Sequence, residues 1–440
     1  MSEQNNLRVK ASPTKELFIY MLTKDLVLVD AIADLVDNCV DGAKRLRHSE
    51  DYRDLFVHLD VTSQIFKITD NCGGMDVKTA REYAFCFGRP SGMPTTDHSI
   101  GNFGVGMKRS LFKLGRFFSV ESKTQTSRFT LEQNIEDWAS VGEWDLYFKE
   151  VEESIEVINT DVGTTITVSN LYPGVSDEFG LDNFLTRLRE KLQTVHQITM
   201  EKGLKIKLNN TRLEFLAPSL IYSDIISPAY EEKDIVTKDD QKVSVRMYAG
   251  LSIPEPSKAG WSVYCNDRLI LESDKGLVTG WGREANNPSY HNDYARFRGF
   301  VFFDSIQSDL LPWNTTKNYI DADLPLYRNV REDMIAIMKP VIDFLRRVSR
   351  DKKKQENDDP SPLELIIKDA EPNPLSSFTT RQSFIAPPES PPEQTAFMNT
   401  IKYQKPLDEV EQVKSVLDVR RLKEVGEKTF EYFMRMECSD

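Results

Sequence analysis

The amino-acid sequence predicts an α+β protein made of two successive α+β regions and a small helical module. Apolar residues recur at helical spacing over roughly residues 14–47, and strand-like runs follow this segment up to residue 171. Further strands and helices cover about 175–350. Beyond residue 350 the composition changes sharply, which indicates a segment of a different kind.

The length and charge of the chain limit the classes of function. It has 440 residues and a formal net charge of -13, with 56 Lys and Arg against 69 Asp and Glu. At roughly 100–200 residues per domain, this length predicts two or three domains. The acidic balance argues against a uniformly basic protein that coats nucleic acid or anionic lipid. DNA binding through a local basic patch stays open, but the net charge does not support it.

The cysteines and the N-terminal segment predict a cytoplasmic protein. The five cysteines are widely spaced and form no C-x-x-C pair, which fits a reducing compartment. The first residues lack the apolar core of a signal peptide. The apolar run at 17–22 is far shorter than the roughly 20 residues that cross a bilayer, so we expect no membrane association.

The predicted elements follow one another along the chain. A helix over roughly 14–47 carries the apolar residues Ile32 and Leu35 on one face. The second region opens with a helix at 182–198 and closes with another near 329–349. Strands are predicted at 55–61, 65–70, 117–122 and 164–171 in the first region, and at 242–250, 261–266 and 298–304 in the second.

Residues 351–400 are predicted to form a proline-rich linker, because eight prolines between Pro360 and Pro392 remove backbone donors and favour extended conformations. The apolar stretch LELII inside this segment could dock back on the main body. Residues 401–440 return to helical spacing. A helical module of this size is too small to be very stable alone, so we expect it to pack on a protein partner or on the main body.

A polar stripe marks the N-terminal helix. It consists of Asp30, Asp34, Asn38 and Asp41, whose spacings of four, four and three place them on one helix face. Crowded acids repel one another unless a cation or a hydrogen-bonded ligand lies among them. A solvated helix face is the simpler explanation of the stripe taken alone, so its meaning depends on the segments that follow it.

Two glycine-containing segments follow the stripe. ITDNCGGMD at 68–76 ends a strand with Asp70, whose carboxylate can accept a hydrogen bond from an exocyclic amine, while the glycines admit a flat ring. A plain turn is the alternative there. IGNFGVGMK at 100–108 can point backbone amides at phosphate oxygens in front of a helix. Its spacing fits neither a Walker A loop nor a dinucleotide fingerprint.

In order and spacing these segments resemble the motifs of the GHKL ATPases. That family includes DNA gyrase, the ninety-kilodalton heat-shock chaperones, MutL, histidine kinases and microrchidia (MORC) proteins. The lid segment is most similar to the chaperone and MORC members. The matching stretches are AIADLVDNCVDGA (31–43), DNCGGM (70–75), IGNFGVGMKRSLFKLG (100–115) and GTTITVSNL (163–171). The family's adjoining transducer domain has similar stretches in GWSVYCNDRLI (260–270) and LPWNTTKNYID (311–321).

The resemblance implies a domain order and a ligand. It implies a Bergerat-type ATP-binding α/β sandwich over 1–173 and a transducer-like α+β domain over 174–350, followed by the linker at 351–400 and the helical module at 401–440. ATP would be the ligand and Mg²⁺ the cofactor. The resemblance also implies an ATP-dependent homodimer, with a lid around residues 88–110 that becomes ordered when ATP binds.

The family's binding roles can be carried over residue by residue. Asn38 would help to hold Mg²⁺, and Asp70 would accept the adenine amine. Gly74 and Met75 would form the floor and edge of the adenine pocket, and Thr164 would support Asp70. The remaining residues expected to contact the nucleotide are Asp41, Gly101, Gly104, Val105, Gly106 and Lys108.

Two residues carry the expected chemistry. Lys317 would stabilise charge on the γ-phosphoryl group. Asp34 stands where the family has a water-activating glutamate, and its side chain is one methylene shorter, so we expect slow hydrolysis. Cys72 replaces the first glycine of the second motif, and we expect it to be a buried packing residue without a catalytic role.

The sequence therefore predicts a Mg²⁺-dependent, slow ATPase that acts as a nucleotide-gated dimerising clamp or conformational switch. The alternative is a nucleotide-binding signalling scaffold with little or no hydrolysis, such as a component of a bacterial antiviral defence system. A histidine kinase is disfavoured, because none of the five histidines lies in a recognisable dimerisation helix.

Overall fold

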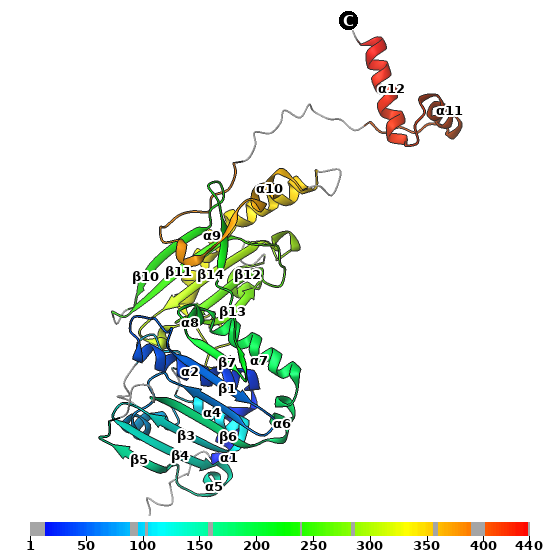
Figure 1. Cartoon of the computed structure of the whole chain (residues 1–440). Coiled ribbons are helices and arrows are strands. Elements are labelled where there is room, and N and C mark those ends of the chain that lie inside the picture. Colours follow the sequence, from blue (N-terminus) through cyan, green and yellow to red (C-terminus); the bar gives the residue numbers. More distant parts are fainter. Residues whose placement is uncertain are drawn as a thin grey trace, which may run out of the picture. The chain divides into compact units, whose positions relative to one another are not determined.

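The computed structural model describes residues 14–88, 96–101, 104–156, 162–237, 240–282, 287–354, 360–388 and 401–438. The chain divides into two compact units, Met1–Pro387 and Pro388–Asp440. The fold is α+β, as predicted, and the larger unit contains an eight-stranded, a five-stranded and a two-stranded sheet together with their helices (Figure 1). Within the described residues, no helix combines the length and the apolar character that a bilayer crossing needs.

The first sheet has eight strands in the order β5-β4-β3-β6-β2-β1-β7-β8. Neighbouring strands are antiparallel except β1 and β7, which pair in parallel. Its central strands alternate buried and partly exposed residues, as expected of a sheet with one packed face. The strands are β1 Phe56–Val61, β2 Phe66–Asp70, β3 Gly115–Lys123, β4 Ser127–Asn134, β5 Phe148–Glu153, β6 Gly163–Leu171, β7 Lys205–Leu208 and β8 Thr211–Arg212.

Helix α2, Leu28–Leu46, is the central helix of this region, and most of its residues are buried. It contacts α4, Gly106–Leu114, and α7, Asp182–Val195. The single helix expected over 14–47 is in fact two helices. Val27 adopts an extended conformation and separates α1, Lys15–Lys24, from α2. The shorter helices of this region are α3 Val77–Thr79, η2 Ala80–Ala84, α5 Ile135–Ser140, α6 Pro173–Phe179 and α8 Gln197–Glu201.

The second sheet has five strands in the order β10-β11-β14-β12-β13. Helix α9, Pro325–Lys352, packs against β11 and β14, and its Met338 accepts a hydrogen bond from the indole of Trp261 at 3.3 Å. The strands of this region are β9 Ser219–Tyr222, β10 Ala229–Val236, β11 Lys242–Leu251, β12 Gly260–Cys265, β13 Arg268–Asp274 and β14 Phe297–Asp304. Single turns of 3-10 helix lie at Leu277–Thr279, Asn292–Tyr294 and Ser308–Leu310.

One continuous cluster of buried apolar side chains runs through both sheets, from Ile32 in α2 to Ile342 in α9. The two regions therefore share a core and belong to one compact unit. The domain boundary expected between residues 173 and 174 remains a prediction.

Part of the expected linker packs on the second sheet. Residues 360–387 include α10, Pro362–Lys368, with a capping box at its start, and β15, Glu371–Pro374, which pairs with β9. The 3-10 turn Leu375–Ser377 follows β15. The expectation of a linker over 351–400 is therefore corrected for residues 360–387, because prolines are tolerated in an edge strand and the apolar LELII stretch buries Ile367. Residues 355–359 and 389–400 lie outside the described residues.

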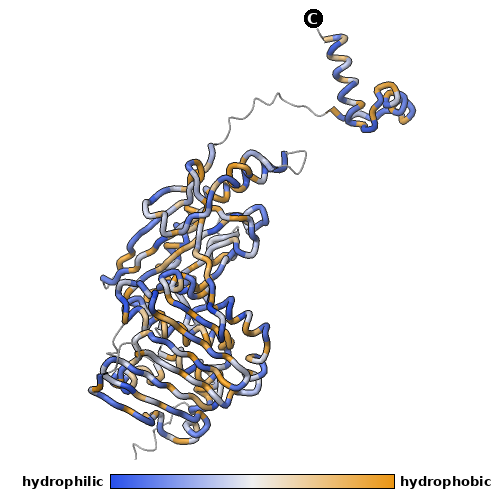
Figure 2. The backbone as a smooth tube through the Cα atoms, viewed as in Figure 1, coloured by the Kyte–Doolittle hydropathy of each residue, from blue (hydrophilic) through white to orange (hydrophobic). Residues whose placement is uncertain are grey.

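The smaller unit contains two helices, α11, Leu407–Leu417, and α12, Leu422–Glu437. Neither helix buries a residue, although Figure 2 shows hydrophobic positions along both. Large apolar side chains such as Phe430 and Phe433 are more than half exposed. The two helices contact each other, and the partner expected for this module remains a prediction.

The shared core predicts the effect of one glycine substitution. Gly299 on β14 lies opposite Trp261 on β12, and an added Cβ would stand 2.4 Å from the indole ring. Gly299→Ala should lower the free energy of unfolding by about 1–3 kcal/mol, measured by denaturant titration, because the ring has no space into which it can move. Gly174→Ala is the control, since nothing lies within 4 Å of its added Cβ, and equal stability losses in both variants would contradict this explanation.

Candidate functional site

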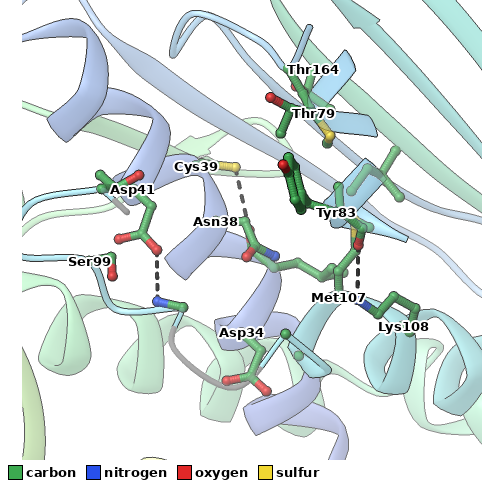
Figure 3. Close-up of a pocket in the computed structure, with 18 of the residues that line it drawn as sticks. Asp34, Asn38, Cys39, Asp41, Thr79, Tyr83, Ser99, Met107, Lys108 and Thr164 are labelled. Carbon is green, nitrogen blue, oxygen red and sulfur yellow. Dashed lines mark hydrogen bonds between the residues drawn. The ribbon is translucent and has the colours of Figure 1, made fainter. Parts of the chain in front are cut away.

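A cavity of about 470 Å³ lies beside α2, at the ends of β2 and β6 and at the start of α4. Figure 3 shows Asp34, Asn38 and Asp41 on one helix beside this cavity. Its lining contains all the residues predicted to form the site, namely Asp34, Asn38, Asp41, Asp70, Gly74, Met75, Gly101, Gly104, Val105, Gly106, Lys108, Thr164 and Lys317.

The polar stripe of α2 is a cavity wall and not a solvated helix face. Asp34 and Asp41 are 2% and 6% exposed. Asp30, the outermost member, does not line the cavity and pairs with Lys191 at 2.8 Å. The stripe therefore divides into three members that face the cavity and one that lies outside it.

One end of the cavity combines a carboxylate with apolar side chains. Asp70, at the end of β2, accepts the amide hydrogen of Cys72 at 2.7 Å, and burial raises the pKa of its carboxyl. The amide of Met75 donates to Ser122 Oγ at 2.7 Å, and that hydroxyl lies 3.1 Å from Thr164 Oγ1. Ile68 and Ile166 also line this part of the cavity.

Gly74 is required by the backbone at this end. Its φ of +69° lies in the left-handed region, and an added Cβ would stand 2.1 Å from the carbonyl oxygen of Lys123. Cys72 is 2% exposed and occupies a packed position, as expected.

Asp41 holds the glycine loop in place. Its two carboxylate oxygens accept the amide hydrogens of Ile100 and Gly101, each at 2.7 Å. Burial is the main influence on this carboxyl and raises its pKa. Asp41 therefore binds the loop backbone at the cavity wall, and its contact with a nucleotide remains a prediction. The lid expected around 88–110 includes residues 89–95 and 102–103, which lie outside the described residues.

Helix α4 begins at the cavity with Gly106, and the side chain of its N-cap residue Val105 makes no capping hydrogen bond. Backbone amides of a first helical turn have no partner within the helix, so they can bind an anion. Lys108 instead turns toward η2, where its Nζ donates to the carbonyl of Ala84 at 2.9 Å, and burial lowers its pKa to about 8. Figure 3 shows this contact beside Tyr83.

A cluster of buried ion pairs forms the other end of the cavity. Lys317, from a loop of the second region, lies 2.8 Å from Asp37 Oδ2 and 3.5 Å from Asp34 Oδ1. Arg109 of α4 binds Asp34 through Nε at 2.9 Å and through Nη2. Arg268 of β13 donates from Nε to Asp37 Oδ1 at 2.8 Å.

The cluster carries more positive than negative charge. Three cations face two carboxylates, and all five side chains are at most 7% exposed. Burial would raise the pKa of Asp37, but the charges of Arg268 and Lys317 outweigh it and hold that pKa well below its usual range. His196, 3.8 Å from Asp37, has no hydrogen-bond partner among the described residues, and burial lowers its pKa to about 4. The imidazole is therefore neutral at pH 7, and the cluster has one excess positive charge.

Sequence reasoning missed several of these residues. Arg109 follows the predicted site residue Lys108, so adjacency was the available signal for it, whereas Asp37 was recognised beside the polar stripe but not as the partner of Arg268 and Lys317. Ser122 lies in a predicted strand and Arg268 in the stretch 260–270 that resembles the transducer domain, but neither pattern indicated that these side chains would contact the cavity wall. Their roles follow from tertiary contacts alone.

Asn38 fits a metal ion that arrives together with phosphate. The side chain lines the cavity, where its amide oxygen could bind a cation, while its buried amide nitrogen has no hydrogen-bond partner in the described part of the chain and could donate to a phosphate oxygen. Within the described residues, no group of three or more His, Cys, Asp or Glu side chains could hold a metal. Mg²⁺ commonly takes one or two protein oxygens and completes its shell with phosphate and water, so a single amide oxygen is compatible with it.

The burial of His196 predicts acid sensitivity. Because its pKa is about 4 in the folded chain and 6.5 without burial, the unfolded chain takes up the proton first. Stability should therefore be fully present above pH 6.5 and fall by roughly 3 kcal/mol as the pH drops to 4. Asp37 titrates below this window. His196→Leu should flatten the decline in free energy of unfolding, measured by denaturant titration at each pH, and an unchanged slope would contradict this assignment.

The comparison with known families agrees with this geometry. Residues 27–164 match the family model described as histidine kinase-, DNA gyrase B- and HSP90-like ATPase. The matched range includes α2, the end of β2, the glycine loop and Thr164. A search of curated proteins found no match. Residues 27–164 therefore form an ATP-binding domain of the GHKL superfamily.

Proposed function

We propose that the chain binds ATP together with Mg²⁺ in this cavity and acts as a nucleotide-gated switch that hydrolyses ATP slowly. One observation carries the proposal, namely that the two ends of the cavity have opposite chemistry. A carboxylate among apolar side chains lies at one end, and a buried cluster with excess positive charge lies at the other. A nucleotide has an aromatic nucleobase joined to a chain of anionic phosphates, so it would match both ends of the cavity.

The end around Asp70 suits adenine. An ionised carboxylate can accept a hydrogen bond from the exocyclic amine, and Ile68 and Ile166 provide apolar surface for the ring. Gly74 lines this end of the cavity and allows the close approach of the Lys123 backbone, which a Cβ would prevent. Ser122 and Thr164 are hydrogen-bonded to each other and brace Met75 at the edge of the pocket.

The end around Lys317 suits phosphate. An uncompensated buried charge is costly, so an anion that enters the cavity would balance the excess charge of the cluster. The first-turn amides of α4 would add neutral donors to the same group. Asn38, on the helix between the two ends, would hold Mg²⁺, which would neutralise phosphate charge when bound.

Asp34 would act as the base for hydrolysis. Its Oδ2 is held by Arg109, whereas its Oδ1 is buried without a hydrogen-bond partner among the described residues and lies 3.5 Å from Lys317 Nζ, so Oδ1 is the oxygen left to accept a hydrogen bond from a water molecule. A base must lie within hydrogen-bond reach of the water that it activates. The short aspartate side chain and the engaged second oxygen both support a slow reaction.

The alternative function, a nucleotide-binding scaffold with little or no hydrolysis, has one observation in its favour. Asp34 is buried in ion pairs with Arg109 and lies close to Lys317, so it has little freedom to approach a water molecule. In either case we propose an ATP-dependent homodimer, which the resemblance supports, a cytoplasmic location, which the cysteine pattern supports, and a protein partner for residues 401–440, which the small size of that module supports. A role in antiviral defence belongs to the alternative.

Asp70→Asn tests the adenine end. The variant loses the charged acceptor, so its affinity for ATP should fall at least about tenfold in calorimetric titration. Because burial raises the pKa of Asp70, ionisation of this group opposes folding, and the variant should be at least as stable as wild type at pH 7. Asp60→Asn, on an exposed position of β1, is the control, and undiminished ATP affinity in Asp70→Asn would contradict the assignment.

Substitutions along α2 separate binding from hydrolysis. Asp34→Ala should bind ATP but lose turnover by at least about a hundredfold, whereas Asn38→Ala should lose Mg²⁺-dependent binding. Asp30→Ala, which alters the stripe outside the cavity, should match wild type in both assays.

Turnover and molecular mass, with and without ATP, are measured for each protein. A wild type that binds no ATP would sink the proposal as a whole. Equal turnover in wild type and Asp34→Ala would remove Asp34 as the base, and ATP binding without any turnover in wild type would favour the scaffold.

A further inference from the structure

The turn between β12 and β13 is buried, although hairpin turns usually lie on the surface. Asn266 and Asp267 form a two-residue turn with positive φ angles of 47° and 68°, as a tight hairpin requires. Asn266, Asp267 and Arg268 are 1%, 6% and 2% exposed. We call these three residues the hairpin tip. The tip belongs to the second sheet but is covered by residues of the ATP-binding region.

The hairpin tip contacts the segment that leads into the glycine loop. Asn266 Nδ2 donates to the carbonyl of Ser99 at 3.0 Å. Lys44 of α2 donates both to the carbonyl of Asn266 at 2.9 Å and to the carbonyl of His98 at 2.8 Å. Ser99 Oγ also lies 3.2 Å from Ser308 Oγ of the second region. The start of the loop is therefore bonded to the second region at several points.

Arg268 joins three parts of the site. Its Nε donates to Asp37 at 2.8 Å, its Nη1 donates to the carbonyl of Lys317 at 2.6 Å, and its Nη2 lies 3.9 Å from Asp34. Lys317 has a φ of +52°, a conformation that is uncommon for residues other than glycine. The bond from Arg268 to its carbonyl supports this conformation, from which the Lys317 side chain reaches the acidic residues of α2.

We propose that Arg268 is a positioning residue that holds Lys317 in place for the terminal phosphate of the bound nucleotide and connects that contact to the second sheet. The inference rests on the proposed function. Asp37 binds both Arg268 and Lys317 through different oxygens, so an anion that draws Lys317 away changes the charge that Arg268 faces. Since Arg268 is the first residue of β13, that change reaches the second sheet directly.

This role predicts a loss of discrimination between nucleotides. A nucleotide with a third phosphate should bind wild type more tightly than ADP does, because only the third phosphate would contact Lys317. A misplaced Lys317 should weaken that preference and leave the adenine end intact. A purely structural role would instead weaken the binding of both nucleotides together.

The test compares four proteins, namely wild type, Arg268→Gln, Arg268→Lys and Arg298→Gln. Arg298 is the matched control, because it is a buried arginine of the same sheet whose hydrogen bonds go to backbone carbonyls outside the cavity. Affinities for ADP and for a non-hydrolysable ATP analogue are measured by calorimetry with Mg²⁺. In both Arg268 variants the ratio of the affinity for the analogue to the affinity for ADP should fall at least about fivefold. Their affinity for ADP should stay within about threefold of wild type. Arg298→Gln should keep the preference.

Arg268→Lys and one additional double variant keep the test decisive if Arg268→Gln does not fold. Arg268→Lys retains the charge beside Asp37, but one ammonium cannot serve both Asp37 and the carbonyl of Lys317 in the geometry of the guanidinium. The double variant Asp37→Asn with Arg268→Gln removes one charge of each sign and avoids an unpaired carboxylate. Both should lose the preference for the analogue.

A second double variant tests whether Arg268 acts through Lys317. Lys317→Ala combined with Arg268→Lys should lose no more preference than Lys317→Ala alone, because residues that act as a unit are not additive.

The outcomes separate the inference from the function on which it rests. If wild type binds neither nucleotide, the proposed function and the inference both fail. If wild type binds both nucleotides equally, if Arg268→Lys keeps the preference, or if the Lys317 and Arg268 effects add, the inference alone is overturned. Equal losses of affinity for ADP and for the analogue would make Arg268 a structural residue and would also overturn it.

Discussion

The buried ion cluster around Asp37 is the interaction on which the rest of this structure depends. It joins α2, α4, the hairpin tip and the Lys317 loop through Asp34, Arg109, Arg268 and Lys317. Removing one member of a buried pair typically costs about 3–5 kcal/mol, because the remaining charge has no partner. These elements are therefore stable only when they are assembled together, which explains why the nucleotide cavity and the second sheet belong to one compact unit.

The cluster also supports the proposal that ligand binding in the cavity is coupled to the second sheet. Its excess positive charge favours an anion, and its cations come from both regions of the larger unit. A ligand that changes the partners of Lys317 acts at the same moment on α2 and on β13. The residues proposed to bind the phosphate therefore also join the two regions of the larger unit.

Much of the site could be predicted from local patterns in the sequence. The helical spacing of Asp34, Asn38 and Asp41 placed them on one face, and Asp70 ended a strand as expected. Local spacing could not distinguish Asp30, which lies outside the cavity, from its neighbours in the stripe. It also missed the break at Val27 and the docking of residues 360–387, since both depend on what the rest of the chain offers for packing.

The sequence by itself determined the motif order, the α+β class and the residue types that line the cavity. These properties are local, because backbone periodicity and the chemistry of single side chains do not require a partner from elsewhere. Only the tertiary structure decided that Arg268 meets Asp37 across 231 positions of sequence, and that Asp41 is bonded to loop amides. Such contacts depend on which charges share a buried space, and burial is a property of the folded chain as a whole.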